Sequence, residues 1–234
     1  MACKSSEVSA PEPSVAREVG DGAAPPAGTA GPVPPPPGIT DARLSRQIAF
    51  LIEIDKLKSV LRHSNLVDLS RRENDAEHSW HLAMFSVVLA EYAAYEVDEA
   101  RVLRMLLIHD LVEVYAGDTF IYDYAAAADQ EERERAAAER LFPQLPDEQA
   151  AALRSLWNEF EQRQTPEARF ARALDRVQPL LLNFHTQGST WRPHKVTRAD
   201  ILRHRAIIED GSPRLWEYID SLLDEAVRRG YLGG

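Results

Sequence analysis

The chain has 234 residues, with 27 Lys and Arg against 37 Asp and Glu, so its formal net charge at pH 7 is −10. This length fits one sizeable domain rather than two, and the acidity argues against duplex nucleic acid as a partner, because phosphate binding needs concentrated Lys and Arg. The single cysteine, Cys3, excludes a disulfide within the chain, no apolar stretch is long enough to span a membrane, and the N-terminus has the features of neither a secretory signal nor a transit peptide, so we expect a cytoplasmic protein.

Residues 1–40 differ in composition from the rest of the chain. They hold most of the 15 prolines and no Phe, Trp or Tyr. A segment of this kind cannot bury enough apolar surface to offset the entropy lost on ordering, so we expect a disordered tail. The folded domain is then expected over residues 41–234.

From Thr40 onward the apolar residues recur at helical spacing. A first helix is expected from Leu44 to Leu61 with Asp41 as its N-cap. A second runs from His78 to Tyr92, and a third covers residues 102–107 and leads into His109-Asp110.

The second half of the chain repeats this helical pattern. Thr165 and Ser212 each precede a proline, which is typical of a helix start with Pro at the first position. No segment is bounded like a β-hairpin. The fold class is therefore an all-α bundle of about seven to eight helices, and an exposed loop is expected over 183–194. The expected helices are 130–141, 148–160, 166–182, 198–209 and 213–227.

The pair His109-Asp110 is the first candidate for chemistry. It follows an apolar run over residues 104–108 that would bury this part of the helix. A buried acid beside a histidine is costly unless its charge is compensated. A divalent cation would compensate it, because imidazole and carboxylate are both ordinary metal ligands. A capped helix end with a His–Asp hydrogen bond is the alternative interpretation.

Further acids and a histidine surround this pair. Glu113 follows His109 by four residues, which places it on the same face of a continuing helix, and Asp118 is expected near the same cavity. His78 lies in the first turn of its apolar helix, and Asp175 interrupts another apolar helix. These residues favour a metal site.

The ordered set His78, His109-Asp110 and Asp175 resembles the H…HD…D pattern of the HD-domain metal-dependent phosphohydrolases. The resemblance covers about residues 44–210. It is closest to the bacterial 5′-deoxynucleotidase branch in the segments Ala76-Glu77-His78-Ser79, His109-Asp110-Leu111-Val112-Glu113 and Gly117-Asp118.

The resemblance implies roles for individual residues. His78, His109, Asp110 and Asp175 would ligate one divalent metal ion, with Mn, Co, Mg and Zn as candidates. The chain has no histidine between Asp110 and Asp175, which favours one metal ion over the binuclear sites of HD phosphodiesterases.

The residues around the implied metal ion would bind substrate and move protons. By the resemblance, Glu113 would be the acid/base and Asp118 would contact the substrate sugar. Arg62, expected on the first helix, would bind the phosphate. His63 stands where this branch tends to place an aromatic residue. His81 is either a fifth ligand or a residue that packs behind the site.

Together these implications describe an enzyme. The expected activity is metal-dependent hydrolysis of (deoxy)nucleoside 5′-monophosphates, with no nucleic acid or membrane as partner. The alternatives are an HD phosphohydrolase for another small phosphorylated metabolite and a non-catalytic, metal-stabilised helical protein. The family also suggests a homodimer, and the apolar helix 213–227 would either pack on a partner or close the monomer core.

Overall fold

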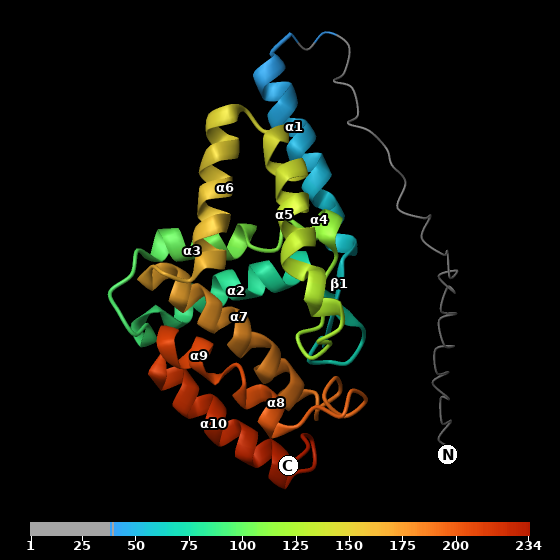
Figure 1. Cartoon of the computed structure of the whole chain (residues 1–234), viewed down its shortest axis with the longest axis vertical. Coiled ribbons are helices and arrows are strands. Elements are labelled where there is room, and N and C mark those ends of the chain that lie inside the picture. Colours follow the sequence, from blue (N-terminus) through green and yellow to red (C-terminus); the bar gives the residue numbers. More distant parts are fainter. Residues whose placement is uncertain (1–37, 39) are drawn as a thin grey trace, which may run out of the picture. The chain divides into compact units, whose positions relative to one another are not determined.

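The computed structural model describes residue 38 and residues 40–234. The expected disordered tail therefore lies almost wholly outside the described residues. The described part is built mainly from helices, which confirms the expected all-α bundle (Figure 1). The α-helices are α1 (Ala42–Ile54), α2 (Asp75–Leu89), α3 (Glu99–Ile108), α4 (Glu113–Ala116), α5 (Gln130–Leu141), α6 (Asp147–Gln162), α7 (Pro166–His185), α8 (Arg198–Leu202), α9 (Arg205–Gly211) and α10 (Pro213–Arg228). The short 3-10 helices are η1 (Asp55–Ser59), η2 (Ala90–Tyr92), η3 (Ala126–Asp129) and η4 (Phe142–Gln144).

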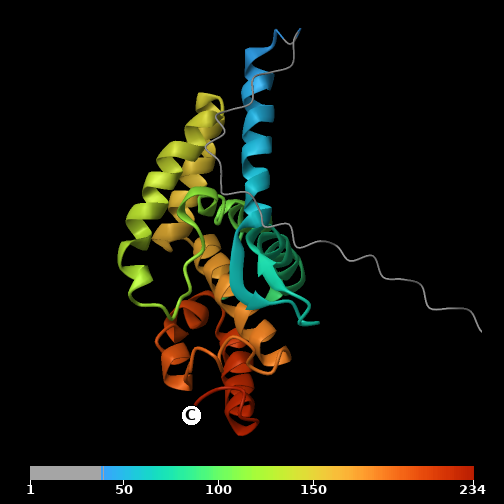
Figure 2. The same cartoon turned by 90° about the vertical axis from the view of Figure 1, so that its right-hand side faces the viewer.

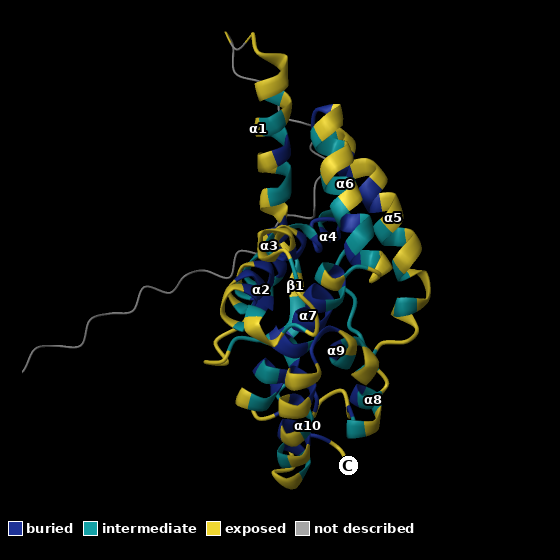
Figure 3. Ribbon diagram, turned by 90° about the vertical axis from the view of Figure 1, so that its left-hand side faces the viewer, coloured by how far each residue is buried: buried dark blue, intermediate teal, exposed yellow. Residues whose placement is uncertain are grey.

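Helix α7 runs through the centre and packs against α2, α3, α6, α9 and α10. Its residues Phe170, Leu174 and Val177 recur at four- and three-residue spacing and are almost fully buried, as expected for the core-facing side of a helix. Figure 3 shows the buried residues gathered on α7 and α2, with exposed residues on the outer faces of α5, α6 and α10. A polar side chain on α7 is therefore surrounded by several elements.

The helix starts follow the sequence signals. The Asp41 side chain accepts a hydrogen bond from the Leu44 backbone N–H at 3.0 Å. Thr165 and Ser212 cap α7 and α10 in the same way, each with Pro at the first helical position. These three caps confirm the expected starts. Among the described residues, none of the helices combines the length and apolar character that crossing a bilayer requires.

The segment after α1 is a β-hairpin, so the expectation of helix up to Leu61 is wrong. Strands β1 (Leu61–Asn65) and β2 (Arg72–Asn74) pair antiparallel (Figure 2). The strands are short, the register between them is irregular, and no alternating pattern marks them in the sequence. Arg72 secures the hairpin by donating to the Leu61 carbonyl at 2.8 Å.

The segment 183–194 is an exposed loop only in part, because α7 extends to His185 and Trp191 is only 1% exposed, whereas residues 192–194 are exposed. Its polar residues form internal hydrogen bonds: the Thr190 hydroxyl donates to the His63 carbonyl at 2.8 Å, and the Thr190 N–H donates to Asn183 Oδ1 at 3.2 Å. Gly188, at φ +73°, lies so close to the Tyr231 carbonyl that a Cβ would clash. The polar composition therefore reflects internal hydrogen bonds at some residues and solvent exposure at others.

The C-terminal region differs from expectation in one further respect. The single helix expected over 198–209 is divided into α8 and α9 at Arg203 and His204. Ile201 and Ile208 are both buried and seven residues apart, as they would be in one continuous helix. The apolar pattern therefore does not indicate the break between α8 and α9. The apolar residues of α10 are buried in the same core, which settles the two alternatives for this helix in favour of closing the monomer.

Candidate metal centre and active site

His78 is held in the first turn of α2 by a capping box. The Asn74 side chain accepts a hydrogen bond from the Glu77 N–H at 3.0 Å, and the Glu77 carboxylate accepts one from the Asn74 N–H at 3.2 Å. The His78 ring is fully buried, and its Nδ1 lies 3.2 Å from Gln178 Oε1. With Nδ1–H donated to Gln178, the lone pair of Nε2 faces Asp175 Oδ1 at 3.1 Å.

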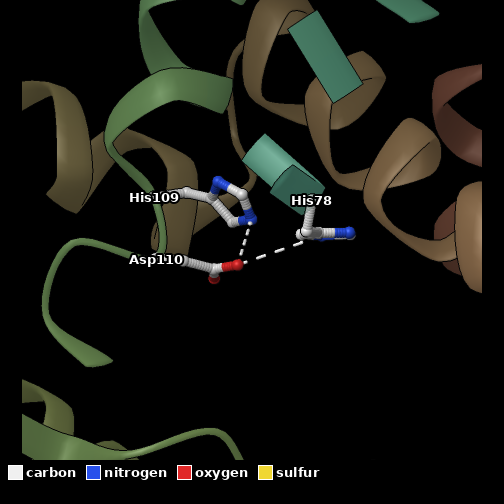
Figure 4. Close-up of side chains that lie close together, drawn as sticks. All are labelled: His78, His109 and Asp110. Atoms are coloured by element: carbon white, nitrogen blue, oxygen red, sulfur yellow. Dashed lines mark ion pairs between the residues drawn. The ribbon is translucent and has the colours of Figure 1, made fainter. Parts of the chain in front are cut away.

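His109 and Asp110 follow directly after α3. His109 Nδ1 lies 2.8 Å from the Leu106 carbonyl, which fixes Nδ1 as the protonated nitrogen. Its Nε2 is buried without a hydrogen-bond partner, 3.1 Å from Asp110 Oδ2 and 3.8 Å from Asp175 Oδ1. Figure 4 shows the Asp110 carboxylate between the two histidine rings, with His78 Nε2 3.9 Å from Asp110 Oδ2.

Asp175 completes the group from the middle of α7. It is 5% exposed, and its Oδ1 lies 3.1 Å from His78 Nε2 and 3.8 Å from His109 Nε2. Its position follows from the central path of α7, which brings a polar side chain against both α2 and the end of α3. The structure thus brings together all four side chains expected to ligate the metal ion.

The residues present fit a divalent cation. Ligand atoms of His78, His109 and Asp110 all lie within 4.8 Å of one another, and all three residues are buried. Two imidazole nitrogens and two carboxylates form a donor set that suits Mn, Co or Zn. His109 Nε2 has no hydrogen-bond partner despite its short distance to Asp110. A simple His–Asp hydrogen bond therefore does not account for the arrangement.

The pKa shifts of His109 and Asp110 also favour a bound divalent cation. Burial alone would lower the pKa of His109, but the charges of Asp110 and Asp175 raise it to about 10. Burial would raise the pKa of Asp110, but the His109 and Arg62 charges hold it far below its ordinary value. The two carboxylates therefore demand a positive charge between them, and a divalent cation can replace the imidazolium proton in that role.

Glu113 lies at the site, but it belongs to a different helix from the one expected. Helix α3 ends at Ile108, and Glu113 begins the separate short helix α4, so His109 and Glu113 do not share one helix face. A tight turn still places Glu113 here, because its N–H donates to the Asp110 carbonyl at 2.9 Å. Burial and the negative charge of Asp110 raise the pKa of Glu113 well above its ordinary value.

Asp75 is a site residue that the sequence reasoning missed. It is fully buried, and its carboxylate lies within 4.8 Å of ligand atoms of Asp110 and Glu113. Burial and the charge of Asp110 raise its pKa to about 6. An acid in the first turn of a helix ordinarily complements the helix dipole, so its position alone does not indicate that Asp75 belongs to the site.

Arg62 lies on β1 rather than on a helix, and it is already paired with carboxylates. Its Nη1 donates to Asp110 Oδ2 at 2.8 Å and to Asp75 Oδ1 at 3.1 Å, and Asp118 Oδ1 is 3.9 Å away. Asp118 follows Gly117, which ends α4 at φ +73°. The next residue after Arg62, His63, stacks on the Phe120 ring with centroids 4.5 Å apart.

A second missed residue, Gln178, supports His78 from behind. While its Oε1 accepts from His78, its Nε2 donates to Glu73 Oε1 at 2.8 Å and lies 3.1 Å from His81 Nδ1. His81 therefore contacts the back of the site through Gln178, as the second of its two interpretations held. Gln178 follows Asp175 by three residues on an apolar helix, a signal that could have identified it.

The ligand cluster opens into a cavity of about 540 Å³. Asp110, Glu113 and Asp118 line its metal end, and α5, α6 and α7 form the rest of its wall. Its volume lies in the range of small-molecule sites, about 300–1,000 Å³.

Comparison with known proteins shows which family model and which solved structures the chain matches. Residues 54–216 match the family model described as HD domain. A solved structure of a predicted metal-dependent phosphohydrolase from Magnetospirillum magnetotacticum MS-1 is 60% identical, covers 82% of this chain and 97% of its own, and superposes with a TM-score of 0.79. A conserved hypothetical protein from Pyrococcus furiosus, 20% identical, covers 77% of this chain and 99% of its own with a TM-score of 0.54, which shows a shared fold alone.

The more distant curated relatives are named 5′-deoxynucleotidases. The 5′-deoxynucleotidase HDDC2 of Xenopus laevis is 26% identical over 150 residues, 64% of this chain and 73% of the frog protein. The 5′-deoxynucleotidase HDDC2 of Homo sapiens is 27% identical over 135 residues, 57% of this chain and 65% of the human protein. The chain thus spans just under two thirds of the human relative.

Proposed function

The chain belongs to the HD domain family and is a metal-dependent phosphohydrolase, and we propose that it hydrolyses (deoxy)nucleoside 5′-monophosphates to nucleoside and inorganic phosphate. The observation that carries the proposal is the buried group His78, His109, Asp110 and Asp175 at the end of a ligand-sized cavity. The names of the frog and human relatives support nucleotides as the substrate class.

His78 Nε2, His109 Nε2 and carboxylate oxygens of Asp110 and Asp175 would hold one divalent ion. Such an ion, when bound, supplies Lewis acidity toward a phosphoryl oxygen and lowers the pKa of a coordinated water. The protein keeps both rings oriented through Leu106 and Gln178, so that neither Nε2 carries the proton when the ion is present.

Glu113 is proposed as the residue that moves the proton. Its buried carboxyl lies beside Asp110, and its Oε2 has no hydrogen-bond partner among the described residues. The environment raises its pKa, so the side chain can take a proton from attacking water and give one to the leaving oxygen. No serine or cysteine nucleophile is required.

Asp118 and Arg62 are proposed to face the substrate. Asp118 lines the cavity and would accept a hydrogen bond from a sugar hydroxyl. Arg62 also lines the cavity, but its Nη1 already donates to Asp110 and Asp75. Arg62 would therefore both position these carboxylates and contact the phosphate.

Release of phosphate from a panel of ribo- and deoxynucleoside monophosphates tests the proposal. Metal-free protein would be reconstituted with Mn²⁺, Co²⁺ or Mg²⁺, and the Glu113→Gln variant would serve as the matched control. Release from 5′-monophosphates by the wild type alone is expected. Release only from other phosphate esters in a parallel panel would favour the non-nucleotide alternative. Folded, metal-loaded protein that releases none would leave the metal as a purely structural element.

A homodimer is also part of the proposal, although the apolar face of α10 is buried in the monomer core. Helix α2 offers an exposed apolar face instead, at the four- and three-residue spacing of one helix side. Light scattering on the wild type and on a Val87→Glu variant would test it, with a dimer expected only for the wild type. The exposed residues of this face are Trp80, Met84, Val87 and Val88.

A further inference from the structure

Asp118, the residue proposed to contact the substrate sugar, lies in a segment with few hydrogen bonds of its own. The Asp118 loop covers residues 117–125, between α4 and η3. Its internal hydrogen bonds centre on Asp123. Within the described part of the chain, Asp118 has no hydrogen-bond partner, and Arg62 Nη1 is 3.9 Å from its Oδ1. The position of Asp118 therefore depends on how the ends of the loop are held.

The loop begins at Gly117, which does not fix its direction. Gly117 has φ +73°, in the region that glycine occupies with little cost. A Cβ at this position would meet no atom within 4 Å, so no neighbouring group packs against it. The chain can therefore leave α4 in more than one direction unless another residue restrains it.

One guanidinium on α5 supplies this restraint. Arg133 Nη1 donates to the Ala116 carbonyl at 2.7 Å, and Nη2 donates to Thr119 Oγ1 at 3.0 Å and to the Ala126 carbonyl at 3.1 Å. Ala116 and Thr119 lie on either side of Asp118 in the sequence, and Ala126 follows the far end of the loop. Arg133 thus joins both ends of the loop and holds the chain on both sides of Asp118.

The geometry of Arg133 suits a fixed restraint. Its planar fork presents several donors in one rigid arrangement, and its Nε donates to Asp129 Oδ1 at 2.9 Å, which orients the plane. Among the described residues, Asp118 and Thr119 line the cavity and Arg133 does not. Arg133 therefore lies behind the cavity wall, where it can position Asp118 without touching the substrate.

We propose that Arg133 is a positioning residue for Asp118 and that it thereby sets how strongly the enzyme depends on a sugar hydroxyl of its substrate. A hydroxyl–carboxylate hydrogen bond forms only over a narrow range, about 2.5–3.0 Å between the oxygens. A loop that swings at Gly117 would lose it. This inference rests on the proposed function and deepens it, because it assigns the sugar dependence to a residue outside the cavity wall.

The test removes the sugar hydroxyls and the restraint separately. KM and kcat would be measured for the 5′-monophosphates of adenosine, 2′-deoxyadenosine and 2′,3′-dideoxyadenosine. A hydrogen bond to a charged group contributes roughly 10- to 100-fold in affinity, so the wild-type KM for the dideoxynucleotide should exceed the lower of the other two by that factor. Arg133→Gln should lose most of this difference, through a raised KM for the hydroxyl-bearing nucleotide, with metal content unchanged. A difference that persists in Arg133→Gln would overturn the proposal.

Two variants within the loop show whether Arg133 acts through Asp118. Asp118→Asn should reduce the same difference, and adding Arg133→Gln to it should raise KM no further. Thr119→Val removes only one contact of Arg133 and keeps the size of the side chain, so it tests the restraint even if Arg133→Gln does not fold. It should reduce the difference in part. Additive rises of KM in the double variant, or no effect of Thr119→Val, would overturn the proposal.

Arg46→Gln is the matched control for a lost arginine restraint. Arg46 on α1 donates to the Pro143 carbonyl at 3.0 Å and to the Gln144 carbonyl at 3.4 Å, and it holds a segment that does not line the cavity. This variant should keep the difference between nucleotides. Amide hydrogen exchange over residues 117–125 should become faster in Arg133→Gln and stay unchanged in Arg46→Gln. Equal behaviour of the two variants in either measurement would overturn the proposal.

Binding to metal-free protein separates this inference from the proposed function. With EDTA present, isothermal titration should show that the wild type binds a hydroxyl-bearing nucleotide more tightly than the dideoxynucleotide and that Arg133→Gln does not. An active wild type that ignores the hydroxyls would refute this inference alone. An inactive wild type with hydroxyl-dependent binding would refute the proposed function and leave the role of Arg133 standing. No binding of any of the three nucleotides would refute both.

Discussion

The two ends of the cavity treat charge in opposite ways. At the metal end, the Nε2 of His109 and buried carboxylate oxygens of Asp75 and Glu113 have no hydrogen-bond partner, although Arg62 donates to Asp110 and Asp75. At the α6–α7 end, Arg172 and Arg176 hold buried donors without partners. Both regions border one cavity. The contrast therefore lies in the sign of the charge that each end carries.

This contrast separates two ways of building a site. The metal end is organised around excess negative charge, which a cation relieves, and the surrounding hydrogen bonds fix the orientation of each ligand before the cation arrives. The α6–α7 end carries the positive charge of Arg163, Arg172 and Arg176, and carboxylates of Glu161 and Asp175 lie 3.6–3.9 Å from two of these arginines. Because the candidate metal ligands gather at the metal end, variants there should change metal binding or catalysis.

The largest effect is expected from Asp110→Ala. The substitution removes a carboxylate that faces both histidines and Arg62, so metal and activity should disappear together. Metal content by elemental analysis and phosphate release on the same preparation would check this, with circular dichroism to confirm folding. Stoichiometric metal with full turnover would show that the cluster is not the metal site.

Glu113→Gln should separate proton transfer from metal binding within the same end. The variant keeps the size of the side chain but cannot exchange a proton, and acid–base catalysis typically contributes about 10²–10⁴-fold. We expect kcat to fall by that factor with metal content and melting temperature nearly unchanged. Loss of metal would instead make Glu113 a ligand, and an unchanged kcat would remove it from the mechanism.

Arg62→Ala tests whether the metal end depends on its own counter-charge. The Arg62 side chain is 13% exposed, and removing it leaves Asp110 and Asp75 without their cation. Breaking a buried ion pair costs about 3–5 kcal/mol, which urea unfolding of the metal-free protein would measure, and added metal should restore part of the loss.

The control for this loss is Arg205→Ala, whose exposed pair with Glu209 at 2.9 Å should contribute at most about 1 kcal/mol. A raised KM for the nucleotide with unchanged stability would contradict the structural role. Arg62 would then be mainly a substrate ligand.

Gln178→Leu should have the smallest effect of these variants. Without the amide, His78 loses the acceptor that fixes its tautomer, and such outer contacts contribute about 10–100-fold in metal affinity. Competition with a fluorescent chelator would measure this change. Gln149→Leu, which removes a hydrogen bond of 2.8 Å to Gln47 between α6 and α1, should leave metal affinity unchanged. Equal affinity in both variants would show that Gln178 only fills space.

The elements that the sequence predicts are those with strong local signals. Helices α7 and α10 follow from periodic apolar residues and from a capping residue before proline. The His78, His109-Asp110 and Asp175 pattern places four side chains that the structure brings together. The β1–β2 hairpin has no such signal, because its short strands depend on Arg72 and on contacts with distant segments. Asp75 and Gln178 were missed because their roles arise from tertiary neighbours. Asp75 fits the first turn of α2 as an ordinary acid, whereas the three-residue spacing of Gln178 from Asp175 is a signal that could have identified it.

The position of the metal ion tests the central claim most directly. Crystals of the protein reconstituted with Co²⁺ or Mn²⁺ would be measured at an energy where that metal scatters anomalously. A single strong anomalous peak is expected within about 2.0–2.2 Å of His78 Nε2, His109 Nε2 and oxygens of Asp110 and Asp175. A peak bound elsewhere, or none at this cluster in protein that carries stoichiometric metal, would contradict the account.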